Sequence, residues 1–130
     1  MEHSSSPDIE FRTSAEMAGL PFSEAVRVGN LLFLSGQLGR DNSGRVVPGG
    51  IAAETQQTMA NIKAALARHG SSLDRVVKAT VFLADMDEWA EMNSVYVTYF
   101  PEHLPARSAL GASGLALGAR VEIECIAVVG

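Results

Sequence analysis

The hydrophobic and polar residues of this chain alternate with two different periods, which indicates a mixture of strands and helices. Residues 25–28 and 31–35 are two mostly apolar runs separated by Gly29-Asn30. This arrangement predicts a β-hairpin, because Gly-Asn supplies the positive φ angles that a two-residue turn needs. The second run is apolar on both faces, so we expect it to lie in the interior of a sheet.

Two longer segments have the period of amphipathic helices. The first is predicted from Ile51 to His69, with Gly70 at the position of a left-handed C-cap. Its predicted inner face consists of Thr55, Thr58, Ile62, Ala65 and Leu66. The second is predicted from about residue 87 to residue 100, and its apolar stripe is interpreted as core. That stripe consists of Trp89, Met92, Tyr96, Tyr99 and Phe100.

Three further strands complete the predicted domain: Val76–Leu83, a short strand at Arg107 and a long strand over residues 119–129. The resulting order is hairpin, helix, strand, helix, strand, strand. Because each helix would be a crossover connection, this order predicts parallel neighbouring strands and both helices on one face of the sheet. The other face must meet solvent or another subunit. Apolar residues on both faces of several strands favour another subunit.

The ends of the chain and its single cysteine bear on organisation and location. Residues 1–20 are polar without a clear period, so we predict a tail or weak edge segment there and one domain over residues 21–130. Cys125 lies in the predicted last strand and has no cysteine to pair with. The N-terminal residues lack the basic and apolar regions of a signal peptide, and no apolar stretch would span a bilayer. We therefore expect a cytoplasmic protein that does not interact with membranes.

Charge and motif content exclude several classes of function. The formal net charge is −5 and the chain has no run of Lys or Arg, which disfavours nucleic-acid binding. His3, His69 and His103 are scattered without the spacing of a metal site. Neither a phosphate-binding glycine loop nor a nucleophile elbow is present.

Arg107 and the carboxylates of the last strand are the candidate chemistry. Glu122 and Glu124 share one strand face by the period of two, in a segment that is otherwise apolar. A planar guanidinium near a carboxylate could hold a small anion and position a water molecule. The alternative is a structural Arg–Glu ion pair at a sheet edge, and residue chemistry alone favours that alternative. Ser35 at a strand end and Asn93 on the second helix are possible helpers.

Several short motifs follow one another from about residue 20 to the C-terminus. They are Pro21-Phe22-Ser23-Glu24-Ala25, Val28-Gly29-Asn30, Ser35-Gly36-Gln37, Gly49-Gly50-Ile51, Asn61-Ile62-Lys63-Ala64, Val77-Lys78-Ala79-Thr80-Val81-Phe82-Leu83 with Asp85-Met86, Met92-Asn93, Pro105-Ala106-Arg107-Ser108 and Val121-Glu122-Ile123-Glu124-Cys125-Ile126-Ala127-Val128. Together and in this order, they make the chain resemble the RidA (YjgF) family of reactive-intermediate deaminases, which also bears the name endoribonuclease L-PSP.

The resemblance implies a chorismate-mutase-like (YjgF-like) α+β fold, a mixed sheet with two helices packed on one face. It also implies a homotrimer with one site in each cleft between subunits. The implied reaction is the hydrolysis of enamines and imines of 2-oxo acids, such as 2-aminoacrylate and 2-iminobutanoate, to a 2-oxo acid and ammonia. No metal or organic cofactor is implied. The family pattern assigns the substrate carboxylate to Arg107 and the attacking water to Glu122, and it places Ser35, Asn93 and the residue at Phe22 in the cleft.

Two positions depart from the best-known members of the family. Phe22 stands where those members have a tyrosine, and Ala109 stands where they have a cysteine. The segment 111–118 also lacks their charged residues and proline. A carboxylate-binding regulatory protein without significant turnover therefore stays open as an alternative. A ribonuclease is the third reading, but it would need a proton-transfer pair and a basic groove that the sequence does not show.

Overall fold

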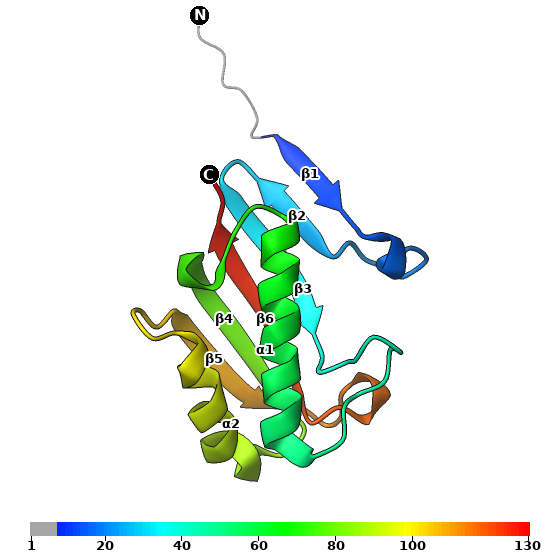
Figure 1. The fold of residues 1–130 in the computed structure, drawn as a ribbon, viewed down its shortest axis with the longest axis vertical. Helices are drawn as coiled ribbons and strands as arrows, with labels where there is room; N and C mark the ends of the chain where they lie inside the picture. Colours follow the sequence, from blue (N-terminus) through cyan, green and yellow to red (C-terminus); the bar gives the residue numbers. More distant parts are fainter. Residues whose placement is uncertain (1–7) are drawn as a thin grey trace, which may run out of the picture.

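The computed structural model describes residues 8–130 as one six-stranded sheet carrying two α-helices (Figure 1). The strand order is β1-β2-β3-β6-β4-β5, and all neighbours are antiparallel except β4 and β5. The α+β fold implied by the family resemblance is therefore confirmed. The parallel neighbours expected from the helix crossovers are formed only by β4 and β5, because β6 lies antiparallel between β3 and β4. The elements are β1 (Ile9–Arg12), β2 (Ala25–Val28), β3 (Leu31–Gln37), α1 (Gly50–Arg68), β4 (Val76–Leu83), α2 (Trp89–Tyr96), β5 (Ala106–Gly111) and β6 (Val121–Val128).

The predicted hairpin is formed by β2 and β3, and β3 lies in the interior of the sheet between β2 and β6. In the turn, Gly29 has a positive φ of 59°. Among the non-glycine residues of the described chain, only Leu117 has a positive φ. Asn30 therefore does not adopt the positive φ that the sequence suggested. The turn needs the left-handed conformation only at its first position. The tail predicted for residues 1–20 is described only from residue 8, and β1 pairs with β2 at the sheet edge.

α1 packs its predicted apolar face against the sheet. The five residues predicted for that face are all buried, and Gly70 follows the helix with φ of 85°. Their burial removes apolar surface from water, which stabilises the fold by about 25 cal/mol per Å². No helix within residues 8–130 is long and apolar enough to cross a membrane.

The second predicted helix is shorter and less regular than its sequence pattern suggested. The α-helical part is α2, and a 3₁₀ turn precedes it at Met86–Glu88 and another follows it at Val97–Tyr99. Met92, Tyr96 and Phe100 are buried as expected. Trp89 is 43% exposed, so its assignment to the core is wrong. It begins the α-helix at the rim of the sheet, where its ring meets the side chain of Arg107.

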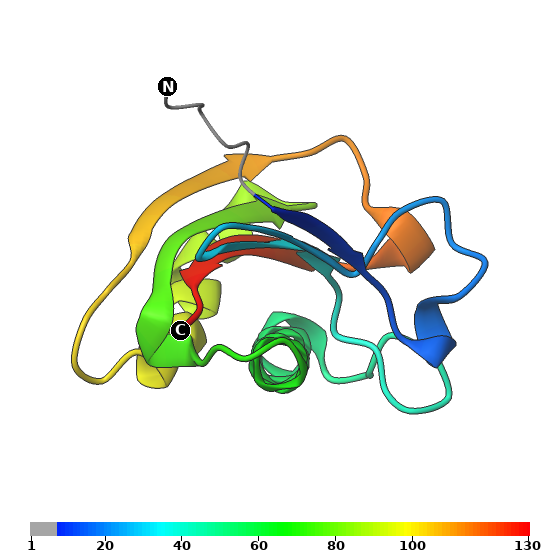
Figure 2. The same ribbon diagram turned by 90° about the horizontal axis from the view of Figure 1, so that it is seen from above.

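Both α-helices lie on the same side of the curved sheet, and neither covers the opposite face (Figure 2). We call this opposite side the open face. The strand register aligns one cross-strand row of apolar side chains on it, made of Phe11, Val26, Phe33 and Ile126. Phe11 and Phe33 are exposed. A row of this kind is typical of a surface that another polypeptide covers.

Candidate active site

Arg107 is held on the helix side of the sheet. It lies on β5 in register with the buried Ala79 of β4, and it therefore shares a face with the core. Its guanidinium carbon lies 4.9 Å from the centroid of the Tyr96 ring and 5.9 Å from that of the Trp89 ring. Aromatic faces attract a guanidinium, and each such contact is worth about 0.5–1 kcal/mol at an exposed site. The two rings restrict where the fork of donors can point.

A groove of about 290 Å³ opens beside this guanidinium. Its lining residues are Asn93, Tyr96, Val97, Leu104, Pro105 and Arg107. The structure thus places Arg107 and Asn93, two of the candidate residues, in one groove. Within residues 8–130, Asn93 Oδ1 and the Tyr96 hydroxyl are buried without a hydrogen-bond partner. Burial raises the pKa of Tyr96 to about 12, although the positive charge of Arg107 opposes the shift. Tyr96 is therefore a neutral hydroxyl at physiological pH.

Glu122 lies on the open face. It is in register with Phe82 of β4, and its two strand neighbours, Val121 and Ile123, are buried beneath the helices. Its carboxylate lies directly against Gly36, where any side chain would overlap with it. Partial burial raises the pKa of Glu122, and the like charge of Glu124 raises it further. A carboxylate with a raised pKa is a stronger base than a free glutamate.

Arg107 and Glu122 consequently project from opposite faces of the same sheet. Among the ion pairs of the described residues, none joins Arg107 to Glu122 or Glu124. The structural ion pair that residue chemistry favoured is therefore not formed within the chain. A single chain also does not bring the guanidinium of Arg107 and the carboxylate of Glu122 into one cavity.

Ser35 and Phe22 are the remaining two candidate residues. Ser35 is half-buried at the end of β3, immediately before Gly36, and its hydroxyl donates to the carbonyl oxygen of Ser23 at 2.6 Å. Phe22 precedes Ser23 and is 48% exposed. The five candidate residues thus form two groups. Arg107 and Asn93 line the groove. Glu122 contacts Gly36, next to Ser35, where the pairing of β3 with β6 shifts register, and Phe22 precedes Ser23, which accepts the hydrogen bond from Ser35.

The structure also adds residues that sequence reasoning missed. Tyr96 is buried in the core as expected, but its ring and that of Trp89 also lie against the guanidinium of Arg107, a role that the sequence analysis did not assign to them. Gly36 matters because its missing side chain leaves room for the Glu122 carboxylate. The Ser-Gly pair at a strand end was the available signal for Gly36, since a glycine there often marks a close approach.

Two other chemistries find no support in the described chain. Cys125 is buried, and desolvation raises its pKa to about 12, so it is not a thiolate nucleophile at neutral pH. No group of three His, Cys, Asp or Glu side chains within residues 8–130 is placed to hold a metal ion. His69 is instead buried against Glu24, with 2.7 Å between its Nε2 atom and Oε1 of that carboxylate. His3 lies outside the described residues.

Comparison with known protein families assigns the fold. Residues 13–129 match the model of the family described as endoribonuclease L-PSP. The chain belongs to this family, also called RidA or YjgF. Among its relatives, a protein of Mus musculus named 2-iminobutanoate/2-iminopropanoate deaminase is 45% identical over 119 residues, which cover 91% of this chain and 88% of the relative. The protein of the same name from Bos taurus is 48% identical over 85% of this chain and 81% of its own. Protein HMF1 of Saccharomyces cerevisiae is 47% identical over 88% of each chain.

Solved structures of the RidA family have the same arrangement of sheet and helices. A Rid-family protein from Yersinia pestis, described as of unknown function, matches with a TM-score of 0.88 at 34% identity, covering 94% of this chain and all of that one. RidA from an Antarctic Psychrobacter matches with a TM-score of 0.81 at 35% identity, over 97% of this chain and all of the other. The resemblance read from the motifs is confirmed by both kinds of comparison.

Proposed function

We propose that this protein hydrolyses reactive 2-imino acids and their enamine tautomers, of the 2-iminobutanoate and 2-aminoacrylate type, to 2-oxo acids and ammonia. The observation that carries the proposal is the guanidinium of Arg107. It lies against the rings of Tyr96 and Trp89 at an open groove, and it forms an ion pair with no carboxylate of the described chain. An arginine prepared in this way suits a ligand that brings its own carboxylate. Relatives at 45–48% identity are named as deaminases of that substrate class.

The reaction needs an anchor and one proton-transferring group. Arg107 binds the substrate carboxylate and orients the imine carbon. The carboxylate of Glu122 accepts a proton from water as the water oxygen bonds to the carbon of the protonated imine and the electrons of the C=N bond neutralise its nitrogen. Glu122 then returns the proton to nitrogen. The C–N bond breaks as the hydroxyl becomes a carbonyl, and the hydroxyl proton leaves with ammonia as NH₄⁺. The raised pKa of Glu122 suits both directions of transfer.

The opposed faces of Arg107 and Glu122 support a site shared between two protomers. We propose a homotrimer in which the open face of one subunit meets the groove edge of the next, so that each cleft takes Arg107 from one chain and Glu122 from its neighbour. The exposed apolar row and Leu104, 64% exposed at the rim of the groove, are consistent with such contacts. Light scattering should give the mass of three chains at micromolar concentration. A monomeric mass would contradict the shared site.

Mixing two inactive variants tests the shared site and the activity together. Arg107→Ala and Glu122→Gln should each lack imine hydrolysis when pure. The two variants are then unfolded and refolded together as an equimolar mixture. In each cleft of the refolded trimers, the chain that supplies Arg107 is intact there with a probability of one half, and so is the chain that supplies Glu122. We therefore expect about a quarter of the parent activity to return. If the site lay within one chain, the mixture would remain inactive. Mixing the two proteins without refolding, at concentrations that keep the trimers intact, is the matched control.

Ammonia release from freshly generated 2-iminobutanoate separates the proposed reaction from the alternatives. A carboxylate-binding regulatory protein would bind 2-oxobutanoate but leave the imine to decay at its spontaneous rate. A ribonuclease would cleave RNA, but the net charge of −5 disfavours binding of the negatively charged RNA backbone. A cytoplasmic location remains a prediction from the sequence.

A further inference from the structure

Ser35 has both of its hydrogen-bond donors occupied by the chain itself. Its hydroxyl lies 2.6 Å from the carbonyl oxygen of Ser23, and because a carbonyl cannot donate, the hydroxyl proton must point at that oxygen. Its backbone N–H donates to the carbonyl oxygen of Glu24 at 2.9 Å. The hydroxyl oxygen retains free acceptor capacity. Towards any ligand at the Glu122 side of the cleft, Ser35 therefore offers lone pairs and no proton.

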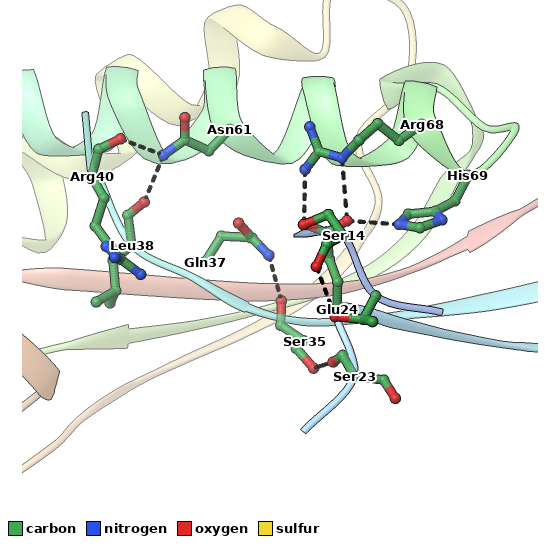
Figure 3. Close-up of polar contacts among 11 residues, drawn as sticks. Ser14, Ser23, Glu24, Ser35, Gln37, Leu38, Arg40, Asn61, Arg68 and His69 are labelled. Atoms are coloured by element: carbon green, nitrogen blue, oxygen red, sulfur yellow. Dashed lines mark hydrogen bonds and ion pairs between the residues drawn. The ribbon is translucent and has the colours of Figure 1, made fainter. Parts of the chain in front are cut away.

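The segment that accepts from these donors is fixed by a charged cluster around the buried carboxylate of Glu24, made of Glu24, Arg68 and His69 (Figure 3). Glu24 is 2% exposed. Its carboxylate accepts from Arg68 Nη2 at 2.8 Å and Nε at 3.2 Å, and its Oε1 atom lies 2.7 Å from His69 Nε2. The pKa of Glu24 is lowered because these partners outweigh the opposing effect of burial. The cluster joins the residues before β2 to the C-terminal end of α1.

The chain beyond Ser35 is attached to the same helix. Asn61 of α1 donates through Nδ2 to the carbonyl oxygens of Leu38 and Arg40, both at 2.9 Å (Figure 3). The Ser35–Gly36 bend is therefore held by α1 from both sides, through Glu24 before it and through Asn61 after it. Such fixation at two points keeps the acceptor direction of Ser35 constant.

We propose that Ser35 is an acceptor-only group that recognises the N–H of the imine substrate and discriminates against the 2-oxo product, and that Glu24 is the positioning residue that keeps it so. This inference rests on the proposed function. The protonated imine of a 2-oxo acid carries N–H donors, which Ser35 Oγ and the Glu122 carboxylate can both accept. The product carries a carbonyl oxygen at the same position, and an oxygen facing two acceptors is repelled. Hydrolysis thus removes the one group that Ser35 binds, which favours product release.

The test compares substrate and product in the same variant. Ser35→Ala should raise KM for 2-iminobutanoate about tenfold, the value of one hydrogen bond to a charged donor, while the inhibition constant of 2-oxobutanoate stays the same or falls. The matched control is Ser71→Ala, which removes an equivalent bond from a serine hydroxyl to the carbonyl oxygen of Val128, 2.8 Å away and on a different strand. The control should leave the ratio of the two constants unchanged. A parallel change of both constants in Ser35→Ala, or no change in either, would overturn the proposal.

Glu24 is tested by the same ratio. Glu24→Ala should raise the ratio of KM for 2-iminobutanoate to the inhibition constant of 2-oxobutanoate, as Ser35→Ala does. Glu24→Gln retains an oxygen acceptor for one partner, so its ratio should lie between those of Glu24→Ala and the parent. If Glu24→Ala does not fold, Glu24→Gln alone decides. A variant that loses thermal stability but keeps the parental ratio would show a merely structural role.

Failure of the proposed function would be distinguishable. If the parent protein shows no turnover, calorimetric binding of 2-aminobutanoate and 2-oxobutanoate replaces the kinetics, because only the former carries N–H donors. Loss of 2-aminobutanoate affinity alone in Ser35→Ala would still support the acceptor role. Equal loss of both would refute it.

Discussion

Replacement of Arg107 by alanine or lysine should abolish measurable turnover of 2-iminobutanoate. A two-point, charge-assisted contact with the substrate carboxylate is worth about 3 kcal/mol of transition-state binding, or roughly a hundredfold in rate. Lysine keeps the charge but loses the planar fork, so it should not rescue the reaction. The spacing of the Tyr96 ring, 4.9 Å from the guanidinium carbon, fits a flat group better than an ammonium.

The same substitution should leave the fold almost intact. Within residues 8–130 Arg107 joins no ion pair, and its contacts to Tyr96 and Trp89 are made at the rim of a groove. Loss of two cation–π contacts should cost about 1–2 kcal/mol. For a chain of this size that lowers Tm by roughly 3–10 °C.

The assay generates the imine in situ with an amino-acid oxidase or a threonine dehydratase and follows its disappearance. Arg75→Ala is a suitable control, because it removes the same charge from a side chain that bonds the carbonyl oxygens of Val128 and Gly130. This control should hydrolyse the imine at the parental rate. If Arg107→Ala were as fast as the parent, the carboxylate anchor would lie elsewhere. If it unfolded instead, Arg107 would be a structural residue.

Three further substitutions probe the Glu122 side of the cleft. Phe22→Tyr should raise the rate only modestly, by about tenfold at most, if Glu122 alone positions the water; strong activity appearing from none would favour the binding-protein alternative. Gly36→Ala should displace the Glu122 carboxylate and reduce kcat at least about tenfold, while circular dichroism shows a native fold, because a flexible side chain can move aside. The raised pKa of Glu122 means that activity should decline from a pH above the usual glutamate range as the solution is acidified. The sign for stability is opposite. A carboxyl with a raised folded pKa stabilises the fold below its unfolded pKa and loses that contribution as pH rises through the folded value. Glu122→Gln should therefore be inactive yet more stable at neutral pH, by no more than about 1 kcal/mol given the solvent screening of a half-exposed group, and a lower Tm than the parent at pH 7 would contradict this.

The strand and helix periods predicted most of the elements of the fold, but not how the strands pair. The hairpin, the face of α1 and the strand Val76–Leu83 are local patterns, and local patterns suffice because the buried positions repeat with the period of each element. The second helix was the exception. Its stripe continues through Val97–Tyr99, where the backbone is a 3₁₀ turn, and a stripe alone does not distinguish the two.

The relation between Arg107 and Glu122 was beyond the reach of the sequence. The period of two places Glu122 and Glu124 on one face, but it does not relate a residue on β5 to one on β6. That relation depends on the register of both strands with β4, where Ala79 faces Arg107 and Phe82 faces Glu122. A shift of one residue in either pairing would have put the two charges on the same face.

The sequence contains part of the information needed to predict the cluster of Glu24, Arg68 and His69. A glutamate directly before an apolar strand is unusual unless it is paired, and Arg68 and His69 stand at the end of a predicted helix. Their meeting depends on the position of α1 across the sheet, which packing of the whole domain sets. Charged clusters of this type are long-range contacts, so composition and periodicity alone do not reveal them.

In the proposed shared site, the positions of Arg107 and Glu122 on opposite faces of the sheet would make activity depend on assembly. A monomer could place Arg107 and Glu122 in one cavity only if both projected from the same face of the sheet. One face packs against the helices and the other is the open face, so Glu122 would then have to take a core position or Arg107 would have to leave the groove. The proposed sharing of the site between chains would avoid this conflict, and it would also cover the apolar row on the open face. The consequence is that dissociation should inactivate the protein without unfolding it. Activity per chain should therefore fall on dilution below the dissociation constant of the assembly, while the circular dichroism of the separated chains keeps its native shape.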